Sequence, residues 1–216
     1  MAGSLADRLG RKLVFTVGLA AFTAASLFAG FATDALTLNI ARGLQGIGGA
    51  AMFGTVLALI AQEFAPRERK TALGIWGASV GVGVAVGPLV GGVLVDSLGW
   101  EWIFFVNVPI GIGAIALTMR KLAESKAPDP EPIDWPGVAT FSASLFLLVF
   151  ALVRGNAEGW SSFPIEGSLA GAALLMLAFV GIEMRSSHPM LDLGLFRKPA
   201  FVGVSAASFA LHAGMF

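Results

Sequence analysis

Arg42 is the residue whose type and position in this sequence most strongly suggest chemistry. It is the one charged side chain in the long apolar stretch between Asp34 and Glu63. A guanidinium about two turns inside such a stretch is costly in a membrane and normally faces a cavity or a carboxylate partner. The alternative is a side chain that snorkels to the outer interface. We predict the first arrangement, which would make Arg42 a functional cation.

Other chemically active groups are sparse. The sequence has no cysteine, which excludes disulfides, thiolate metal sites, iron–sulfur clusters and cysteine nucleophiles. The two histidines, His188 and His212, do not fall on adjacent turns of one helix, as a two-histidine zinc site requires. Ser208 stands one helical turn before His212, but no nucleophile-elbow pattern surrounds it. We expect a packing role for His212, with titration inside the membrane as the alternative. The sequence predicts no enzyme and no metal site.

The composition is that of a membrane protein. Hydrophobic residues make up 56% of the chain and charged residues 13%, whereas roughly a quarter of the residues in ordinary soluble domains are charged. The 14 Lys and Arg residues balance the 14 Asp and Glu residues. There is therefore no basic surplus of the kind that binds nucleic acid.

The distances between charged residues locate the membrane-spanning segments, because a spanning helix needs about 20 mostly apolar residues. Stretches free of Asp, Glu, Lys and Arg occur at residues 13–33, 43–62, 71–95, 102–119, 135–153, 167–182 and 199–216. The sixth is short unless its helix also includes residues 163–166, and a buried soluble helix is its alternative. These stretches are too long for barrel strands. We predict an all-α membrane protein with seven transmembrane helices.

The basic residues predict the orientation. All of them except Arg42 and Arg154 fall in alternate connections, on what the positive-inside rule identifies as the cytoplasmic side. The Pro-rich residues 127–136 form a cytoplasmic linker in this arrangement. Tryptophans beside the predicted helix ends support the same spans, because their rings suit the headgroup layer; they are Trp100, Trp102, Trp135 and Trp160.

Two further strings have a distinctive pattern. Gly83, Gly87 and Gly91 recur every fourth residue, which makes a smooth groove for the close approach of another helix, although generic small-residue packing is the alternative. Pro88 should bend this helix. Residues 3–12 are predicted from composition alone to be a solvated basic loop with glycines at its turns.

Four strings in order resemble the major facilitator superfamily of transporters. Residues 3–12 resemble its loop between helices 2 and 3, and residues 38–46 its helix 4 signature. Residues 83–92 resemble the helix 5 signature of its drug:proton antiporters, and residues 102–111 are similar to helix 6 of the fourteen-helix, EmrB/QacA-like subfamily. The sequence departs from the pattern at Glu101, where relatives usually carry a basic residue. Gly54 also departs, standing near a common proline.

This resemblance implies a partial major facilitator bundle made of helices 3 to 9 of fourteen. Residues 1–120 would be part of the amino-terminal bundle (helices 3 to 6) and residues 121–136 the cytoplasmic linker. Residues 137–184 would form the extra helix pair (helices 7 and 8), and residues 185–216 a cytoplasmic loop and helix 9. Because helices 1, 2 and 10 to 14 would be missing, we expect no transport by residues 1–216 alone.

The function implied by the resemblance is proton-coupled efflux of small amphipathic drugs or toxic compounds across the cytoplasmic membrane by alternating access. Its partners would be a small-molecule substrate, protons and the lipid bilayer, without a cofactor or nucleic acid; whether a periplasmic adaptor takes part is left open. Alternatives are an exporter of one metabolite on the same fold, and a non-transporting sensor or truncated fragment.

The resemblance also assigns roles to individual residues. Arg42, with Gln45 beside it, would face the transport cavity and promote proton release from a carboxylate, commonly found on helix 1. A cytoplasmic gate motif would latch the two bundles, with Asp7 meeting the positive end of a helix of the other bundle; its residues are Gly3, Asp7, Arg8, Gly10 and Arg11. The helix-packing antiporter motif would control leakage and rocking, through Gly83, Gly87, Pro88, Gly91 and Gly92.

Overall fold

The computed structural model describes residues 2–128 and 132–213, with side chains up to residue 210. Within these ranges the regular structure is entirely helical. The chain divides into two compact units, Met1–Pro130 and Glu131–Phe216. Each unit is therefore described by itself.

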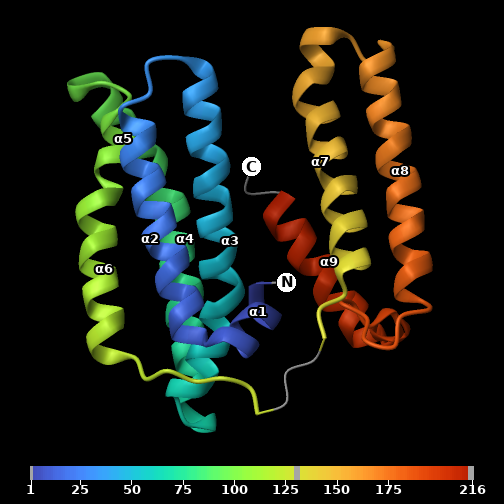
Figure 1. Cartoon of the computed structure of the whole chain (residues 1–216), viewed down its shortest axis with the longest axis horizontal. Helices are drawn as coiled ribbons and strands as arrows, with labels where there is room; N and C mark the ends of the chain where they lie inside the picture. The colour runs from blue at the N-terminus through green and yellow to red at the C-terminus, as the bar shows by residue number, and fades with distance from the viewer. Residues whose placement is uncertain (1, 129–131, 214–216) are drawn as a thin grey trace. The chain divides into compact units, whose positions relative to one another are not determined.

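The described residues of the first unit form six helices (Figure 1). They are α1 (Ala2–Leu9), α2 (Arg11–Gly30), α3 (Ala35–Glu63), α4 (Pro66–Leu98), α5 (Trp102–Phe105) and α6 (Asn107–Lys121). Helix α2 packs against α1, α3, α5 and α6, so it is the centre of the unit. Among the described residues, helix α4 packs mainly against α3 and α5, and none of its residues is buried.

Local sequence explains where α3 begins. Asp34 is its N-cap, and the Asp34 carboxylate accepts hydrogen bonds from the Thr37 N–H at 2.9 Å and the Thr37 hydroxyl at 2.6 Å. These bonds hold the pKa of Asp34 below its usual range. A lowered folded-state pKa means that the cap is fully formed at neutral pH and is lost only in acid. Arg42 therefore lies two turns inside a capped helix.

Helices α5 and α6 form one membrane-spanning segment, Trp102–Lys121, interrupted at Val106. Pro109 explains the interruption, because it has no N–H to donate to the carbonyl of Phe105. Close to this break lies a small core of the unit. Ala29 of α2, Ala41 of α3 and Phe104 of α5 are buried together there.

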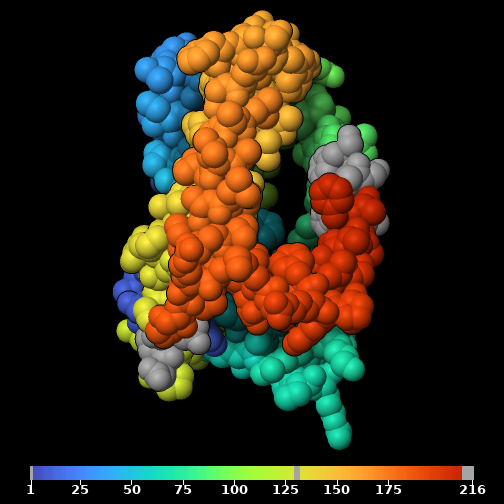
Figure 2. Space-filling model, turned by 90° about the vertical axis from the view of Figure 1, so that its right-hand side faces the viewer, coloured from blue at the N-terminus to red at the C-terminus, as the bar shows by residue number. Residues whose placement is uncertain are grey.

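The second unit is built on an antiparallel pair, α7 (Trp135–Glu158) and α8 (Phe163–Glu183), followed by η1 (Leu193–Arg197) and α9 (Pro199–Ala213). The pair is joined by the buried Ser144 hydroxyl, which donates to the carbonyl of Ala172 at 2.8 Å. Figure 2 shows the length of α8 as a column of side chains. The exposed side chains of α8 include large apolar residues, as lipid-facing positions require; they are Phe163, Leu174 and Leu177.

Six of the described helical segments are long and apolar enough to cross a membrane, and they coincide with the first six predicted spans. They confirm the prediction of an all-α membrane fold. Helix α8 includes residues 163–166, so its length no longer supports the alternative of a short soluble helix. The seventh predicted span is a shorter apolar helix, α9, within the described residues.

The prediction of a basic loop at residues 3–12 is wrong for most of that string. Residues Ala2–Leu9 form helix α1, and only Gly10 makes a turn, with φ of 128°. The composition was misleading because it does not show that the charged residues pair with each other. Asp7 and Arg11, four residues apart, form an ion pair, and Ala6 beside them is fully buried. The glycine expected at a turn, Gly3, lies inside α1 instead.

Candidate functional site: a cation network and a charged helix corner

Arg42 begins a chain of hydrogen bonds that crosses from α3 to α2. Its Nη1 donates to Gln45 Oε1 at 2.9 Å, and Gln45 Nε2 donates to Ser26 Oγ at 2.6 Å. The Ser26 hydroxyl donates in turn to the carbonyl of Phe22 at 2.8 Å. Arg42 also lies over the ring of Phe104, with Cζ 5.9 Å from the ring centroid. Arg42 and Gln45, both singled out from sequence, thus lie together.

Solvent exposure differs sharply among these hydrogen-bonded residues. Gln45 is 3% exposed and Ser26 is fully buried, whereas the Arg42 side chain is exposed on the surface of the unit. Within the described ranges, Arg42 forms no ion pair with a carboxylate. The network therefore orients a positive charge without neutralising it. Such a charge can attract an anion or promote ionisation of a carboxylate brought near it.

Sequence reasoning missed Ser26 and Phe104. Neither has a signal of its own, since Ser26 resembles any small residue of an apolar helix and Phe104 any core aromatic. Their roles follow from the packing of α2 and α5 against α3, which a single sequence does not specify.

Of the predicted gate residues, Asp7, Gly10 and Arg11 lie together at the corner between α1 and α2, whereas Gly3 lies near the start of α1, beside Gly54 of α3. The Arg11 guanidinium donates to Asp7 Oδ1 from Nε at 2.9 Å and from Nη2 at 2.7 Å. Gly10 separates the two helices with a positive φ that favours glycine. Arg8 is exposed on α1. The partner expected for Asp7, a helix of another bundle, is not among the described residues, and Asp7 pairs with Arg11.

Glu124 is a part of this corner that sequence reasoning did not identify. Its Oε1 accepts from the N–H of Lys12 at 3.1 Å and its Oε2 from the N–H of Leu13 at 3.0 Å. The carboxylate thus caps the first turn of α2, where unpaired N–H groups and the helix dipole favour a negative charge. Gly10 leaves the space for it, because a Cβ there would lie 2.7 Å from the Glu124 carboxylate.

Neighbouring bonds hold the same segment across the helix ends. The Arg11 N–H donates to the carbonyl of Ser125 at 2.9 Å, and the Ala127 N–H donates to the carbonyl of Asp7 at 3.0 Å. From α3, Gln62 Nε2 donates to the carbonyl of Ala123 at 3.3 Å, and its Oε1 accepts from the Ser125 hydroxyl. The segment after α6 therefore ties the ends of α2, α3 and α6 together.

Replacing Glu124 by alanine should loosen this corner. Loss of a helix N-cap costs about 1 kcal/mol, which corresponds to about fivefold faster hydrogen exchange at locally opening amides. We expect this acceleration at the Lys12 and Leu13 amides, measured by hydrogen–deuterium exchange with mass spectrometry.

Glu166→Ala is the matched control, since Glu166 is also an exposed glutamate but belongs to the first turn of α8 in the second unit. Unchanged exchange at Lys12 and Leu13 in Glu124→Ala would show that the carboxylate does not cap α2.

The glycines of the predicted helix-packing motif, unlike the gate residues, make no close contacts with the described residues of the first unit. Gly83, Gly87 and Gly91 lie on α4, and a Cβ added at any of them would meet no atom of the described chain within 4 Å. Helix α4 continues through Pro88, and Gly92 is equally open. Within the described residues of the first unit, no helix packs into this predicted groove.

Other glycines make the close helix contacts. A Cβ on Gly48 of α3 would lie 2.6 Å from the carbonyl oxygen of Gly18 of α2, and a Cβ on Gly18 would lie 2.9 Å from that of Gly48. Gly54, noted from sequence as a departure, lets the start of α1 approach α3, because a Cβ there would lie 2.5 Å from Ala2 Cβ. Sequence reasoning favoured the regular spacing on α4 and missed these contacts.

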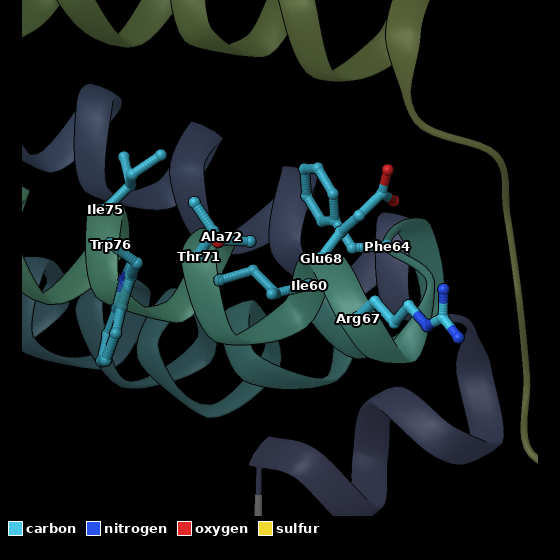
Figure 3. Close-up of a pocket in the computed structure, with 8 residues that line it drawn as sticks. All are labelled: Ile60, Phe64, Arg67, Glu68, Thr71, Ala72, Ile75 and Trp76. Atoms are coloured by element: carbon cyan, nitrogen blue, oxygen red, sulfur yellow. The ribbon is translucent and has the colours of Figure 1, made fainter.

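A groove of about 550 Å³ lies between the end of α3 and the first turns of α4. In Figure 3, Arg67 and Glu68 point in different directions near one end and Trp76 lies near the other. Its remaining lining is mainly apolar, namely Ile60, Phe64, Thr71, Ala72 and Ile75. None of the site residues predicted from sequence lines it.

The described residues contain no group of three or more His, Asp or Glu placed to hold a metal ion. Ser208 is exposed on α9, and the side chain of His212 lies outside the described residues. His188 follows α8, where its Nδ1 lies 3.0 Å from the Ser187 hydroxyl.

A fixed cation held in a bundle of membrane-spanning helices is an arrangement typical of transport proteins. Comparison with known families agrees with that class. The chain matches the Major Facilitator Superfamily over residues 1–216 and belongs to it. It is therefore a multi-pass membrane protein of a transporter family, and the family indicates a transporter rather than an enzyme.

Several curated relatives have names that refer to drugs or antibiotics. The chain is 36% identical to the "Multidrug transporter protein MdtP" of Bacillus subtilis over all of its length and 40% of that protein. It is 36% identical to the "Tetracenomycin C resistance and export protein" of Streptomyces glaucescens, over 91% of the chain and 37% of the relative. It is 39% identical to the "Multidrug resistance protein Stp" of Mycobacterium tuberculosis, over 93% of the chain and 37% of the relative. The chain thus spans about two fifths of these relatives.

Proposed function

We propose that the transporter containing this chain exports small amphipathic compounds across the cytoplasmic membrane in exchange for protons, by alternating access. The observation that carries the proposal is the Arg42–Gln45–Ser26 network, in which buried Gln45 and Ser26 orient an exposed positive charge on a membrane-spanning helix without neutralising it. The names of the relatives support drug and antibiotic export. No cofactor takes part.

Arg42 couples the export of substrate to the entry of protons in this proposal. When a carboxylate of the complete transporter approaches the guanidinium, the positive charge favours the carboxylate form and a proton leaves. When substrate or a conformational change separates them, the carboxyl group regains a proton from the other side. Gln45 and Ser26 keep the guanidinium in place during this cycle.

The remaining predicted sites act on the conformational change. We assign the Asp7–Arg11 corner, capped by Glu124, to a gate on the cytoplasmic side, where the basic connections place it. The open glycine face of α4 receives a helix of the second bundle. Residues 1–120 belong to the amino-terminal bundle, 121–136 to the linker, 137–184 to the extra pair and 185–216 to the start of the second bundle.

Export of one specific metabolite is a second candidate, favoured by the relative named for tetracenomycin C resistance and export. The two candidates share the fold and the coupling, so they differ only in the breadth of substrates. A panel of chemically unrelated dyes and antibiotics distinguishes them, because a multidrug exporter transports several and a dedicated exporter one.

The test uses inside-out membrane vesicles that contain the product of the complete reading frame in which this sequence occurs. An imposed pH gradient should drive accumulation of a cationic dye, and an ionophore that collapses the gradient should abolish it. Accumulation that persists without a proton gradient would rule out proton coupling.

A further inference from the structure

Two acidic side chains meet at one end of the α7–α8 pair, where α7 begins and α8 ends. Asp134 is the N-cap of α7, and its Oδ1 accepts from the N–H of Gly137 at 2.9 Å. Glu183 is the last residue of α8, and its Oε2 accepts from the N–H of Leu191 at 3.1 Å. Each carboxylate thus accepts a backbone N–H with one oxygen. These bonds do not account for the position of its second oxygen.

Those second oxygens are buried and lack a hydrogen-bond partner. Asp134 Oδ2 and Glu183 Oε1 are both inaccessible to solvent and unpaired within the described part of the chain. Glu183 as a whole is only 4% exposed. An unpaired carboxylate oxygen in such a place is unfavourable, because burial removes its water without supplying a donor.

The two unpaired oxygens face the same small space. A Cβ placed on Gly137 would lie 2.8 Å from Asp134 Oδ2 and 2.9 Å from Glu183 Oε1. The oxygens therefore lie no further apart than the sum of these distances. Glycine at position 137 keeps this space free of a side chain that would separate them.

Among the described residues, neither Asp134 nor Glu183 forms an ion pair. Arg185 lines a cavity of about 370 Å³ together with Asp134, but its guanidinium lies beside Gly181, and neither unpaired oxygen bonds to it. In the segment after α8, the His188 ring contacts the Ser187 hydroxyl, and the Asp192 carboxylate accepts from the N–H of Gly194.

We propose that Asp134 and Glu183 bind one proton between them. One carboxyl group then carries the O–H and donates to the unpaired oxygen of the other, so a single proton satisfies both oxygens and removes the repulsion between two like charges. This is a proton-binding site on the α7–α8 pair, distinct from the Arg42 network.

Infrared spectroscopy of this chain in lipid nanodiscs tests the proposal directly. At neutral pH the exposed carboxyl groups are ionised, so we expect one protonated-carboxyl carbonyl band that shifts in heavy water and disappears at alkaline pH. Asp134→Asn and Glu183→Gln should each abolish the band, because the amide N–H replaces the shared proton and lets the remaining carboxyl ionise. Glu166→Gln, a glutamate at the other end of α8, should leave the band unchanged.

The wild-type spectrum alone can overturn the proposal, even where a variant fails to fold. Absence of a protonated-carboxyl band at neutral pH would show that both groups are ionised. A band that survives in a folded Asp134→Asn or Glu183→Gln protein would belong to another residue and would equally contradict the shared site.

Discussion

Replacing Arg42 by alanine is expected to lower proton-driven efflux by the complete transporter about 10- to 100-fold. Hydrogen bonds to charged groups contribute about 1.5–3 kcal/mol, and each 1.4 kcal/mol changes a rate about tenfold. The variant removes the fixed charge together with the bond to Gln45 Oε1 and the contact with Phe104. Dye efflux from energised vesicles, normalised to the amount of transporter in the membrane, measures the effect.

Two matched variants separate charge from packing. Arg42→Lys keeps the charge but loses the fork geometry of the guanidinium, so we expect partial activity. Ser26→Ala removes only the far end of the network, and a small loss is expected because Gln45 still bonds to Arg42. Efflux at the parental rate in Arg42→Ala would refute a role of this cation in transport.

The Gly48→Leu substitution should have the largest effect on folding of the first unit. Its side chain would enter the contact with α2, where even a Cβ would lie 2.6 Å from the Gly18 carbonyl oxygen and 2.7 Å from the Phe22 N–H nitrogen. Backbone atoms do not move aside as flexible side chains do, so we expect a destabilisation at the upper end of the overpacking range, about 3 kcal/mol. Loss of cooperative thermal unfolding, followed by circular dichroism in detergent, measures it.

Gly43→Leu on the same helix is the control, because a Cβ there meets nothing within 4 Å. Gly87→Leu on α4 should likewise leave the stability of this chain unchanged, since its position is open. In the complete transporter, by contrast, we expect Gly87→Leu to impair transport if a helix of the second bundle packs there. Equal stability of Gly48→Leu and Gly43→Leu would disprove the close α2–α3 contact.

The positions of the helices could be predicted well, because membrane insertion depends on the length of apolar stretches. The ends of the helices could not be predicted in this way, because a helix can continue beyond the apolar stretch into charged residues until a capping residue or a turn ends it. Thus α3 begins at its Asp34 cap, well before the charge-free stretch 43–62, and α4 extends over Pro66–Leu98 rather than 71–95. The helix at Ala2–Leu9 escaped notice because it is short and charged.

The candidate site was only partly accessible from sequence. Arg42 stood out by its charge, and the resemblance indicated Gln45, Asp7 and Arg11. Ser26, Glu124 and Glu183 gave no such signal, because their roles depend on N–H groups and side chains brought close by folding. The α4 glycines show the converse, because their pattern is strong in the sequence but a Cβ at these positions would meet nothing within 4 Å among the described residues.

The most direct test of the central proposal measures protons and substrate together. The complete transporter is reconstituted in liposomes that contain a pH-sensitive dye, and substrate is added outside without an imposed proton gradient. Proton-coupled exchange predicts a change in luminal pH on substrate addition, absent in Arg42→Ala. Substrate uptake without any change in luminal pH, or the same change in Arg42→Ala, would contradict the account.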